Sequence, residues 1–380
     1  MNSKESIYIV TMRLDVGGTE TQILSLCDGL KNQYKIKLFS FSTTGLLYAR
    51  FKKMGVDVRG IHKPFSKNRL CLFLRAIRVF FNISYAILFL DRPKIIQSFL
   101  PLPNFLGAII GRLFSIPSVT CWRSLTGYRD RNLIAYKMDQ ISLNLSRKIV
   151  CNSQAVLDDL ATEMPHIRHK ADVIYNGLTF SSVPLKKDKQ ARLKKSLGLQ
   201  PGNIGIIYVA NLIEYKGHRD LLKALSILSS STLKNIKLFL AGKDGGIATD
   251  LKQYAKQLGI HKHVSFLGLR HDVHDLLQVM DMGVMASHEE GFSNALLEKL
   301  EAGLSVVVTD VGGNKEAIKG LQHCFIAPAK DPDLLSKEIL KATQSLGDSA
   351  WKKKNRDHVR ARFSNEKMVV AYKTLIGKTS

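Results

Sequence analysis

Cysteine is scarce in this sequence, and its few cysteines lie far apart. They are Cys27, Cys71, Cys121, Cys151 and Cys324, and no two of them form a Cys-x-x-Cys pair. A small secreted fold held by disulfides would show a denser and more closely spaced set, so that class is excluded. We expect reduced thiols that pack as small hydrophobic side chains in a cytosolic protein.

Acidic residues are also few in comparison with basic ones. The 380 residues include 56 Lys and Arg but only 32 Asp and Glu, which gives a formal net charge of +24. A charge of this size favours an anionic partner: nucleic acid, an anionic membrane or a phosphorylated substrate. The excess is present in both halves of the chain and no recognisable nucleic-acid-binding module accompanies it, so we do not expect nucleic acid as a partner.

Long hydrophobic runs are nearly absent. The first one, Ile7–Met12, is short and soon followed by Asp15, so we expect no signal peptide. The exception is Leu70–Leu90, an almost wholly apolar stretch that contains Arg75 and Arg78.

The apolar stretch has three interpretations. It is long enough for a transmembrane helix, but its two arginines argue against one. It is also compatible with a helix buried between the sheet and its neighbours. We favour a basic, aromatic-rich helix on an anionic membrane surface, because lysines and arginines cluster from residue 50 onward. Residues 50–90 are therefore predicted to attach the protein peripherally to the inner face of the cell membrane.

Short strand-like runs and helix-like segments alternate along most of the chain. Examples are the strands predicted at Ser6–Thr11, Ile204–Ala210 and Ser305–Thr309, each followed by a turn and a helix. This alternation predicts an α/β protein with two parallel, doubly wound sheets. Residues 178–201 are polar and rich in lysine, as expected of a linker between two domains. Ligands of such sheets bind beyond the carboxyl ends of the strands.

The most informative stretch is Asp281–Glu316. Its pattern predicts strand, loop, helix and strand, with Ser293 as the N-cap of the helix. The free N–H groups of a helix start favour phosphate or pyrophosphate. Glu290 lies before this helix and Glu298 about one turn inside it. Their carboxylates suit the hydroxyl groups of a sugar or ribose, although acids at a helix start are also favoured by the helix dipole alone.

This stretch resembles the signature of the retaining family-4 glycosyltransferases. Glu290 and Glu298, with GFSNALL between them, match an E-x(7)-E pattern, and EAG and a VGG-x-x-E loop follow. The resemblance implies GT-B architecture, in which two Rossmann-like domains face a cleft. It implies a first domain at 1–182, a nucleotide-sugar-binding domain at 183–359, and a C-terminal helix at 360–378 that packs back on the first domain.

The resemblance also implies which residues act on the donor. Lys216 would stabilise the leaving diphosphate, and Glu290 would hold the sugar hydroxyls and favour the positive charge of the transition state. Asn211 stands where the family usually has a basic residue. The expected donor-binding residues are Gly17, Gly18, Asn211, Lys216, Arg270, Gly291, Phe292, Ser293, Asn294, Ala295 and Glu298.

The acceptor side of the first domain matches the family less closely. Arg123 follows a predicted strand and resembles a position that faces the acceptor. The loop after the strand 94–100 lacks the histidine that family members often carry there, which indicates changed substrate choice or lost activity.

The sequence thus predicts a retaining, metal-independent glycosyltransferase. We expect a UDP- or GDP-sugar donor, no separate cofactor, and a lipid-linked, surface-polysaccharide or lipopolysaccharide-type acceptor. No metal is expected, because no Asp-x-Asp cluster occurs where a diphosphate would need one. The alternatives are an inactive nucleotide-sugar-binding protein of the same fold and a nucleotide-sugar epimerase.

Overall fold

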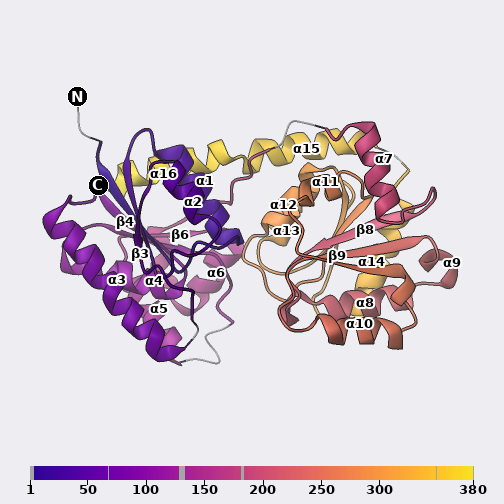
Figure 1. The fold of residues 1–380 in the computed structure, drawn as a ribbon, viewed down its shortest axis with the longest axis horizontal. Helices are drawn as coiled ribbons and strands as arrows, with labels where there is room; N and C mark the ends of the chain where they lie inside the picture. Colours follow the sequence, from indigo (N-terminus) through magenta and orange to yellow (C-terminus); the bar gives the residue numbers. More distant parts are fainter. Residues whose placement is uncertain (1–3, 67, 128–132, 181–183, 348, 380) are drawn as a thin grey trace. The chain divides into compact units, whose positions relative to one another are not determined.

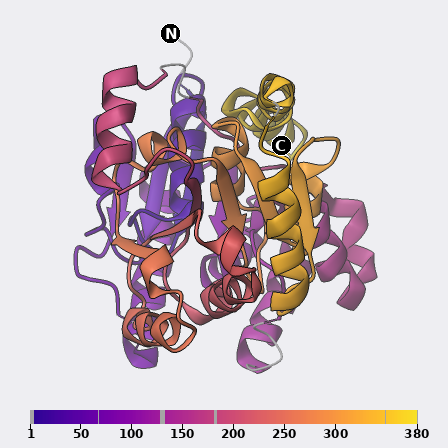
Figure 2. The same ribbon diagram turned by 90° about the vertical axis from the view of Figure 1, so that its right-hand side faces the viewer.

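The computed structural model describes residues 4–66, 68–127, 133–180, 184–347 and 349–379. The chain forms two compact units, each with a parallel sheet covered by helices on both faces (Figures 1 and 2). Unit 1 consists of Met1–Thr179 and Ser364–Ser380, and unit 2 consists of Phe180–Phe363. The predicted fold class, two doubly wound α/β domains, is confirmed.

The sheet of unit 1 has seven strands in the order β3-β2-β1-β4-β5-β6-β7. The strands are β1 (Ser6–Thr11), β2 (Lys35–Ser40), β3 (Asp57–Gly60), β4 (Ile95–Phe99), β5 (Ser118–Trp122), β6 (Lys148–Cys151) and β7 (Ala171–Val173). All pair in parallel, and every residue of the central β1 and β4 is buried. Burial on both faces explains why these strands show no alternation of apolar and charged residues, although β4 contains the buried Gln97.

Helices cover both faces of this sheet. They are α1 (Gly18–Leu30), α2 (Tyr48–Lys53), α3 (Arg69–Phe89), α4 (Pro101–Leu113), α5 (Leu133–Leu145), α6 (Gln154–Glu163) and α16 (Asn365–Thr379), with a 3-10 turn η2 (Pro165–Lys170). Ile23 of α1 and Ile376 of α16 pack with Ile9 in one core cluster. Val79 of α3 and Ile110 of α4 pack with Tyr8 in another.

Most of the predicted helix 360–378 is the single helix α16, and only residues 360–363 belong to the end of the preceding helix, α15 (Ala350–Phe363). α15 belongs to unit 2, and α16 starts anew in unit 1. The interruption lies at Ser364, whose hydroxyl accepts a hydrogen bond from the backbone N–H of Lys367 at 3.2 Å. A serine at this position caps the second helix and ends the first.

The sheet of unit 2 has six parallel strands in the order β10-β9-β8-β11-β12-β13. They are β8 (Ile204–Val209), β9 (Ile236–Ala241), β10 (Val264–Gly268), β11 (Met282–Met285), β12 (Ser305–Thr309) and β13 (Cys324–Ala327). The order reverses between β8 and β11, and such a switch point opens a crevice at the carboxyl ends of the two strands.

The helices of unit 2 also cover both faces of the sheet. They are α7 (Lys187–Ser196), α8 (His218–Ile227), α9 (Ser230–Leu233), α10 (Ala248–Gln257), α11 (Val273–Leu277), α12 (Asn294–Glu301), α13 (Asn314–Ile318), α14 (Pro332–Gln344) and α15, with 3-10 turns η3 (Glu214–Lys216) and η4 (His261–His263). α8 packs against α10 and α14, whereas α12 packs against α11 and α15 (Figure 1).

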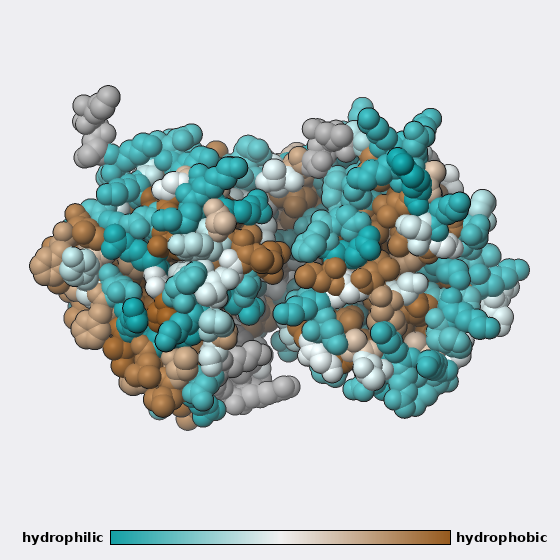
Figure 3. All heavy atoms as spheres, viewed as in Figure 1, coloured by the Kyte–Doolittle hydropathy of each residue, from teal (hydrophilic) through white to brown (hydrophobic). Residues whose placement is uncertain are grey.

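Helix α3 carries its apolar residues on the outside as well as on the inside. Val79 and Ile83 are buried against the sheet. The outer face is formed by Leu70, Phe73, Leu74, Ile77, Phe81, Tyr85, Leu88 and Phe89, all exposed. Hydrophobic side chains gather over α3 in Figure 3. Within the described residues, α3 is also the helix that is long and apolar enough to cross a membrane.

Arg75 does not belong to the basic surface that the sequence predicts around α3. Its side chain is only 6% exposed, and its guanidinium donates to the carbonyl oxygens of Phe41 at 2.6 Å and Pro64 at 2.7 Å. Phe41 is buried, so its carbonyl oxygen needs a donor, and Arg75 supplies one. Arg78, one turn further along, is exposed.

Candidate active site

The two residues predicted to be catalytic meet at the switch point of unit 2. Lys216 ends the turn η3 after β8, and Glu290 lies in the loop after β11. The Lys216 Nζ donates to Glu290 Oε1 at 2.6 Å, and the two side chains are 18% and 12% exposed. The pair is therefore mostly enclosed and still reachable from solvent, as a ligand-binding ion pair must be.

Backbone contacts hold the two loops together. The N–H of His288 donates to the carbonyl oxygen of Tyr215 at 2.7 Å. Gly217 has a left-handed φ of 65°, and a Cβ atom on it would lie 1.9 Å from the Ala286 oxygen. Only glycine therefore allows the Lys216-Gly217 turn to approach the end of β11 this closely.

The start of α12 lies directly after Glu290. Ser293 is the N-cap, as predicted, and its hydroxyl accepts from the Leu296 N–H at 3.3 Å. The glycine loop after β12 packs on this segment, because the Gly313 N–H donates to Gly291 at 2.7 Å and a Cβ on Gly312 would lie 2.0 Å from the Glu290 oxygen. The predicted residues Gly291, Phe292, Ser293, Asn294 and Ala295 thus form the segment that directly follows Glu290 and leads into α12. The start of α12 carries the positive end of the helix dipole, which can attract an anion.

Glu298 lies within α12, next to a residue that sequence reasoning missed. Lys299 is fully buried, and its Nζ donates to the Ala295 oxygen at 3.1 Å. Its stem lies on β11, where a Cβ on Gly283 would meet the Lys299 Cδ at 2.4 Å. Burial lowers the pKa of Lys299 to about 8 and raises the pKa of Glu298, while each charge partly stabilises the other. The sequence does contain a signal for the burial of Lys299, because position 299 lies one helical turn after the buried Leu296 and so on the same face of α12.

We expect Lys299→Met to change how stability depends on pH. Between pH 8 and the ordinary lysine value of 10.5, the unfolded chain binds a proton that folded Lys299 has lost, so the wild-type free energy of unfolding rises with pH. The methionine variant should lose this rise, which is on the order of 2 kcal/mol. Urea unfolding of both proteins at pH 7.5 and pH 10 would measure it. Equal slopes in the two proteins would contradict the assignment.

Asn211 and Arg270, also predicted to bind the donor, have local partners. The Asn211 side-chain oxygen accepts from the Lys243 N–H at 3.2 Å. Arg270 forms two hydrogen bonds with Asp272, at 2.8 Å and 2.6 Å. Asn211 thus fixes the loop after β9. Asp272 occupies one edge of the Arg270 guanidinium and leaves its face for a nucleotide base to stack on.

The predicted residues of unit 1 lie at the carboxyl ends of its strands. Gly17 is the extended N-cap of α1, and a Cβ on it would lie 2.5 Å from Glu20 Oε2. Arg123 follows β5 and donates to the Asn176 side chain at 2.5 Å. Burial raises the pKa of Glu20 and lowers the pKa of Arg123, and each is stabilised by the other's charge. Glu20, in the motif GGTETQ, was not singled out from the sequence.

The loop without a histidine contains a strained residue. Leu100 joins β4 to α4 with φ of 78° and ψ of 154°, a conformation that few residues other than glycine adopt. It lies at the switch point of unit 1, where β1 and β4 are neighbours. Strain of this kind concentrates at ligand sites.

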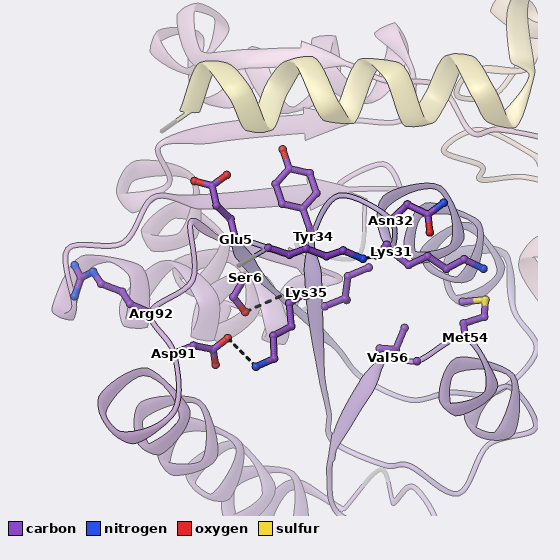
Figure 4. Close-up of a pocket in the computed structure, with 13 residues that line it drawn as sticks. Glu5, Ser6, Lys31, Asn32, Tyr34, Lys35, Met54, Val56, Asp91 and Arg92 are labelled. Carbon is purple, nitrogen blue, oxygen red and sulfur yellow. Dashed lines mark hydrogen bonds and ion pairs between the residues drawn. The ribbon is translucent and has the colours of Figure 1, made fainter. Parts of the chain in front are cut away.

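A cavity of about 910 Å³ lies in unit 1, away from these residues (Figure 4). Ser6 and Lys35, the first residues of β1 and β2, line it, so it opens at the amino ends of the strands. Its cations are engaged locally: Lys35 lies 3.8 Å from Asp91, and Arg92 donates to the Phe114 and Ser115 oxygens. None of the residues predicted from the sequence to form the site lines this cavity.

Comparison with known proteins adds relatives for both units. An uncharacterized glycosyltransferase of Methanocaldococcus jannaschii is 25% identical over 333 residues, 84% of this chain and 84% of the relative. An Escherichia coli UDP-Gal:α-D-GlcNAc-diphosphoundecaprenol α-1,3-galactosyltransferase is 23% identical over 299 residues, 77% of each chain. The crystal structure of Anabaena HepE in complex with UDP has a TM-score of 0.81 at 18% identity, covering 98% of this chain and 100% of HepE, a likeness of fold.

Two family models match the chain, one on each unit. The model of Glycosyltransferase Family 4 matches residues 16–181, and the model of Glycosyl transferases group 1 matches residues 189–358. Together with the fold, these matches indicate that the chain is a glycosyltransferase of the GT-B type, with a family 4 domain followed by a group 1 domain.

Proposed function

We propose that this chain transfers a sugar from a nucleoside diphosphate sugar to a lipid-linked or polysaccharide acceptor, with retention of the anomeric configuration. The observation that carries the proposal is the Lys216–Glu290 pair beside the start of α12, at the switch point between β8 and β11. The proposal is supported by the Anabaena neighbour, which was solved with UDP, and by the Escherichia coli relative, whose name specifies UDP-galactose and a diphosphoundecaprenol acceptor.

The proposed chemistry uses charges that the chain itself supplies. The bond from the sugar C1 to the diphosphate oxygen breaks, and a bond from C1 to the acceptor oxygen forms on the same face. The acceptor hydroxyl passes its proton to the departing diphosphate. Lys216 and the positive end of the α12 dipole at Ser293–Ala295 stabilise the departing diphosphate. Glu290 binds sugar hydroxyls and stabilises positive charge at C1, and Glu298 binds the ribose. The proposal requires no metal ion and no cofactor beyond the nucleotide sugar.

A nucleotide screen followed by a transfer assay tests this function. We expect UDP or GDP to raise the midpoint of thermal unfolding, because a ligand that binds only the folded state stabilises it by mass action, whereas CMP should not. The matching nucleotide sugar is then incubated with an undecaprenyl-diphosphate-linked sugar, with and without EDTA. A product with the donor's anomeric configuration, formed in both, is expected. Absence of any nucleotide shift would overturn the proposal.

We also propose that the outer face of α3 lies on an anionic membrane. Its eight exposed apolar side chains form one continuous helix face, and the exposed Arg69 and Arg78 border it. Burying one such Leu or Phe side chain is worth about 1.5–3 kcal/mol, so a few of them suffice for peripheral attachment. The basic residues add attraction to anionic headgroups. This attachment would bring the enzyme to a lipid-linked acceptor at the cytoplasmic face of the membrane.

Vesicle co-sedimentation tests the attachment. The wild type should bind vesicles that contain phosphatidylglycerol more strongly than vesicles of phosphatidylcholine alone. Leu74→Ser with Phe81→Ser should weaken this binding at least about 10-fold, since two apolar contacts are lost. Val370→Ser is the matched control, because Val370 is an exposed apolar residue of α16, outside the α3 face. Equal binding by the double variant and the wild type would show that α3 does not attach the protein.

A further inference from the structure

We propose that Tyr208 and Ser287 are positioning residues that hold Lys216 and Glu290 in place from the buried side of the ion pair. The inference rests on the proposed function, because it assigns these hydroxyl groups a part in the transfer reaction. Tyr208 lies in β8 and Ser287 follows β11, so the two strands at the switch point contribute one residue each. Both side chains are fully buried, and neither can therefore touch a donor sugar directly.

Each hydroxyl group contacts one member of the ion pair. The Tyr208 Oη donates to the backbone oxygen of Lys216 at 2.6 Å. The Ser287 Oγ donates to Glu290 Oε1 at 2.8 Å, the same oxygen that accepts from Lys216. The two hydroxyl oxygens lie 3.0 Å apart.

Counting hydrogen atoms fixes the direction of these bonds. Two hydroxyl groups have two hydrogens, and three contacts share them. A carboxylate and a backbone carbonyl only accept, so Ser287 must donate to Glu290 and Tyr208 to Lys216 if both acceptors are to be satisfied. Burial raises the pKa of Tyr208 well above its usual range, so the phenol keeps its hydrogen at every working pH.

Neighbouring residues fix both hydroxyl groups in place. The Thr309 Oγ1 donates to the backbone oxygen of Ser287 at 2.6 Å. The ring of His218 stacks on the ring of Tyr208 with centroids 4.8 Å apart. Burial lowers the pKa of His218 to about 4, so the stacked imidazole is neutral and adds no charge below the ion pair.

This arrangement has a consequence for donor binding. Without a donor, Glu290 is oriented by both Lys216 and Ser287. When the ammonium group of Lys216 turns to the diphosphate, Ser287 is the donor that keeps the Glu290 carboxylate oriented toward the sugar. Tyr208 meanwhile keeps the backbone of Lys216 in the same position through its hydrogen bond to the Lys216 carbonyl oxygen. A site held in this way needs no rearrangement during the reaction.

Two hydroxyl-deleting variants, each with a matched control, test the inference. Ser287→Ala should lower kcat of transfer about 10-fold and change the KM for the donor less than about 3-fold, because the lost bond acts on orientation during the reaction. Its control is Ser305→Ala. Ser305 has a buried hydroxyl at the amino end of β12, whereas the site lies at the carboxyl ends of the strands. Tyr208→Phe should lower kcat about 5-fold. Its control is Tyr8→Phe, which removes a buried hydroxyl that donates to a carbonyl in unit 1.

A second readout does not depend on turnover. Lys216 is acylated with acetic anhydride in the nucleotide-free protein, and its labelling rate is measured by mass spectrometry. We expect Ser287→Ala and Tyr208→Phe to raise this rate at least about 3-fold, because the ion pair loses its support, while both controls match the wild type. Raised labelling in a protein without transferase activity would refute the proposed function and leave the positioning role intact. Labelling and kcat equal to those of the controls would overturn the inference.

Discussion

Replacing Lys216 with methionine is expected to lower kcat/KM for sugar transfer about 100-fold to 1,000-fold, the usual cost of removing one preorganised electrostatic contact to a developing charge. Methionine keeps most of the length of the lysine stem and removes the ammonium group. Glu290 would then keep the Ser287 hydrogen bond and lose its charged partner at 2.6 Å. A mostly enclosed carboxylate without a cation beside it also repels an incoming diphosphate, which adds to the loss.

The matched control for this prediction is Lys256→Met. Lys256 is an exposed lysine at the end of α10 in the same unit, so its replacement changes the net charge equally without touching the ion pair. Thermal unfolding of all three proteins verifies folding, and initial rates at several donor concentrations give kcat and KM. A Lys216→Met enzyme with more than about a tenth of wild-type kcat/KM would remove Lys216 from the proposed mechanism.

The fold could be predicted because its signals are local. Runs such as Ser305–Thr309 are β-branched, and turns followed by capped helices separate them, so alternation alone indicates parallel sheets. The start of α16 was placed a few residues too early, because α15 ends directly before it and a serine inside a helical pattern is an ambiguous signal.

The sequence suggested residues for the candidate site but not the contacts between them. Lys216 and Glu290 are 74 positions apart, and they meet because β8 and β11 are neighbours in the sheet. The order of strands depends on long-range pairing, which a local pattern does not encode. The sequence therefore did not indicate that Ser287 and Tyr208 contact Glu290 and Lys216, since a serine after a strand and a tyrosine within one are common.

Burial of charged side chains was the second source of error. Arg75 and Lys299 both occur among apolar residues, and the sequence suggested a basic surface for the first and nothing for the second. In the structure the Arg75 guanidinium donates to the backbone oxygen of Phe41, and the Lys299 ammonium group donates to the backbone oxygen of Ala295. Whether a long basic side chain reaches outward or inward depends on the space opposite it, and for Lys299 that space exists because residue 283 is glycine.

Replacing Glu298 with glutamine is expected to lower kcat/KM about 100-fold, mainly through a higher KM for the donor. In the proposed site the Glu298 carboxylate accepts hydrogen bonds from two ribose hydroxyls, and a charged acceptor forms bonds about twice as strong as a neutral one. The amide keeps the shape of the side chain and can accept only one of the two bonds. Because the ribose does not react, its contact is made equally before and during the reaction, so kcat should fall far less than kcat/KM. Glu289→Gln, an exposed glutamate one residue before Glu290, is the control.

Protonation of the Glu298 carboxylate should also weaken nucleotide binding at low pH, which gives the acidic limb of the curve of nucleotide affinity against pH. Burial raises the pKa of Glu298, so as pH falls its ability to accept two hydrogen bonds is lost earlier than for an exposed glutamate. The Lys299 charge lowers the pKa of Glu298 and opposes this loss. Lys299→Met should therefore move the acidic limb of nucleotide affinity to higher pH, and Glu298→Gln should abolish it. Calorimetric titration of the nucleotide from pH 5 to pH 8 separates the two. An acidic limb that persists unchanged in Glu298→Gln would assign the titration to another group and remove Glu298 from the ribose site.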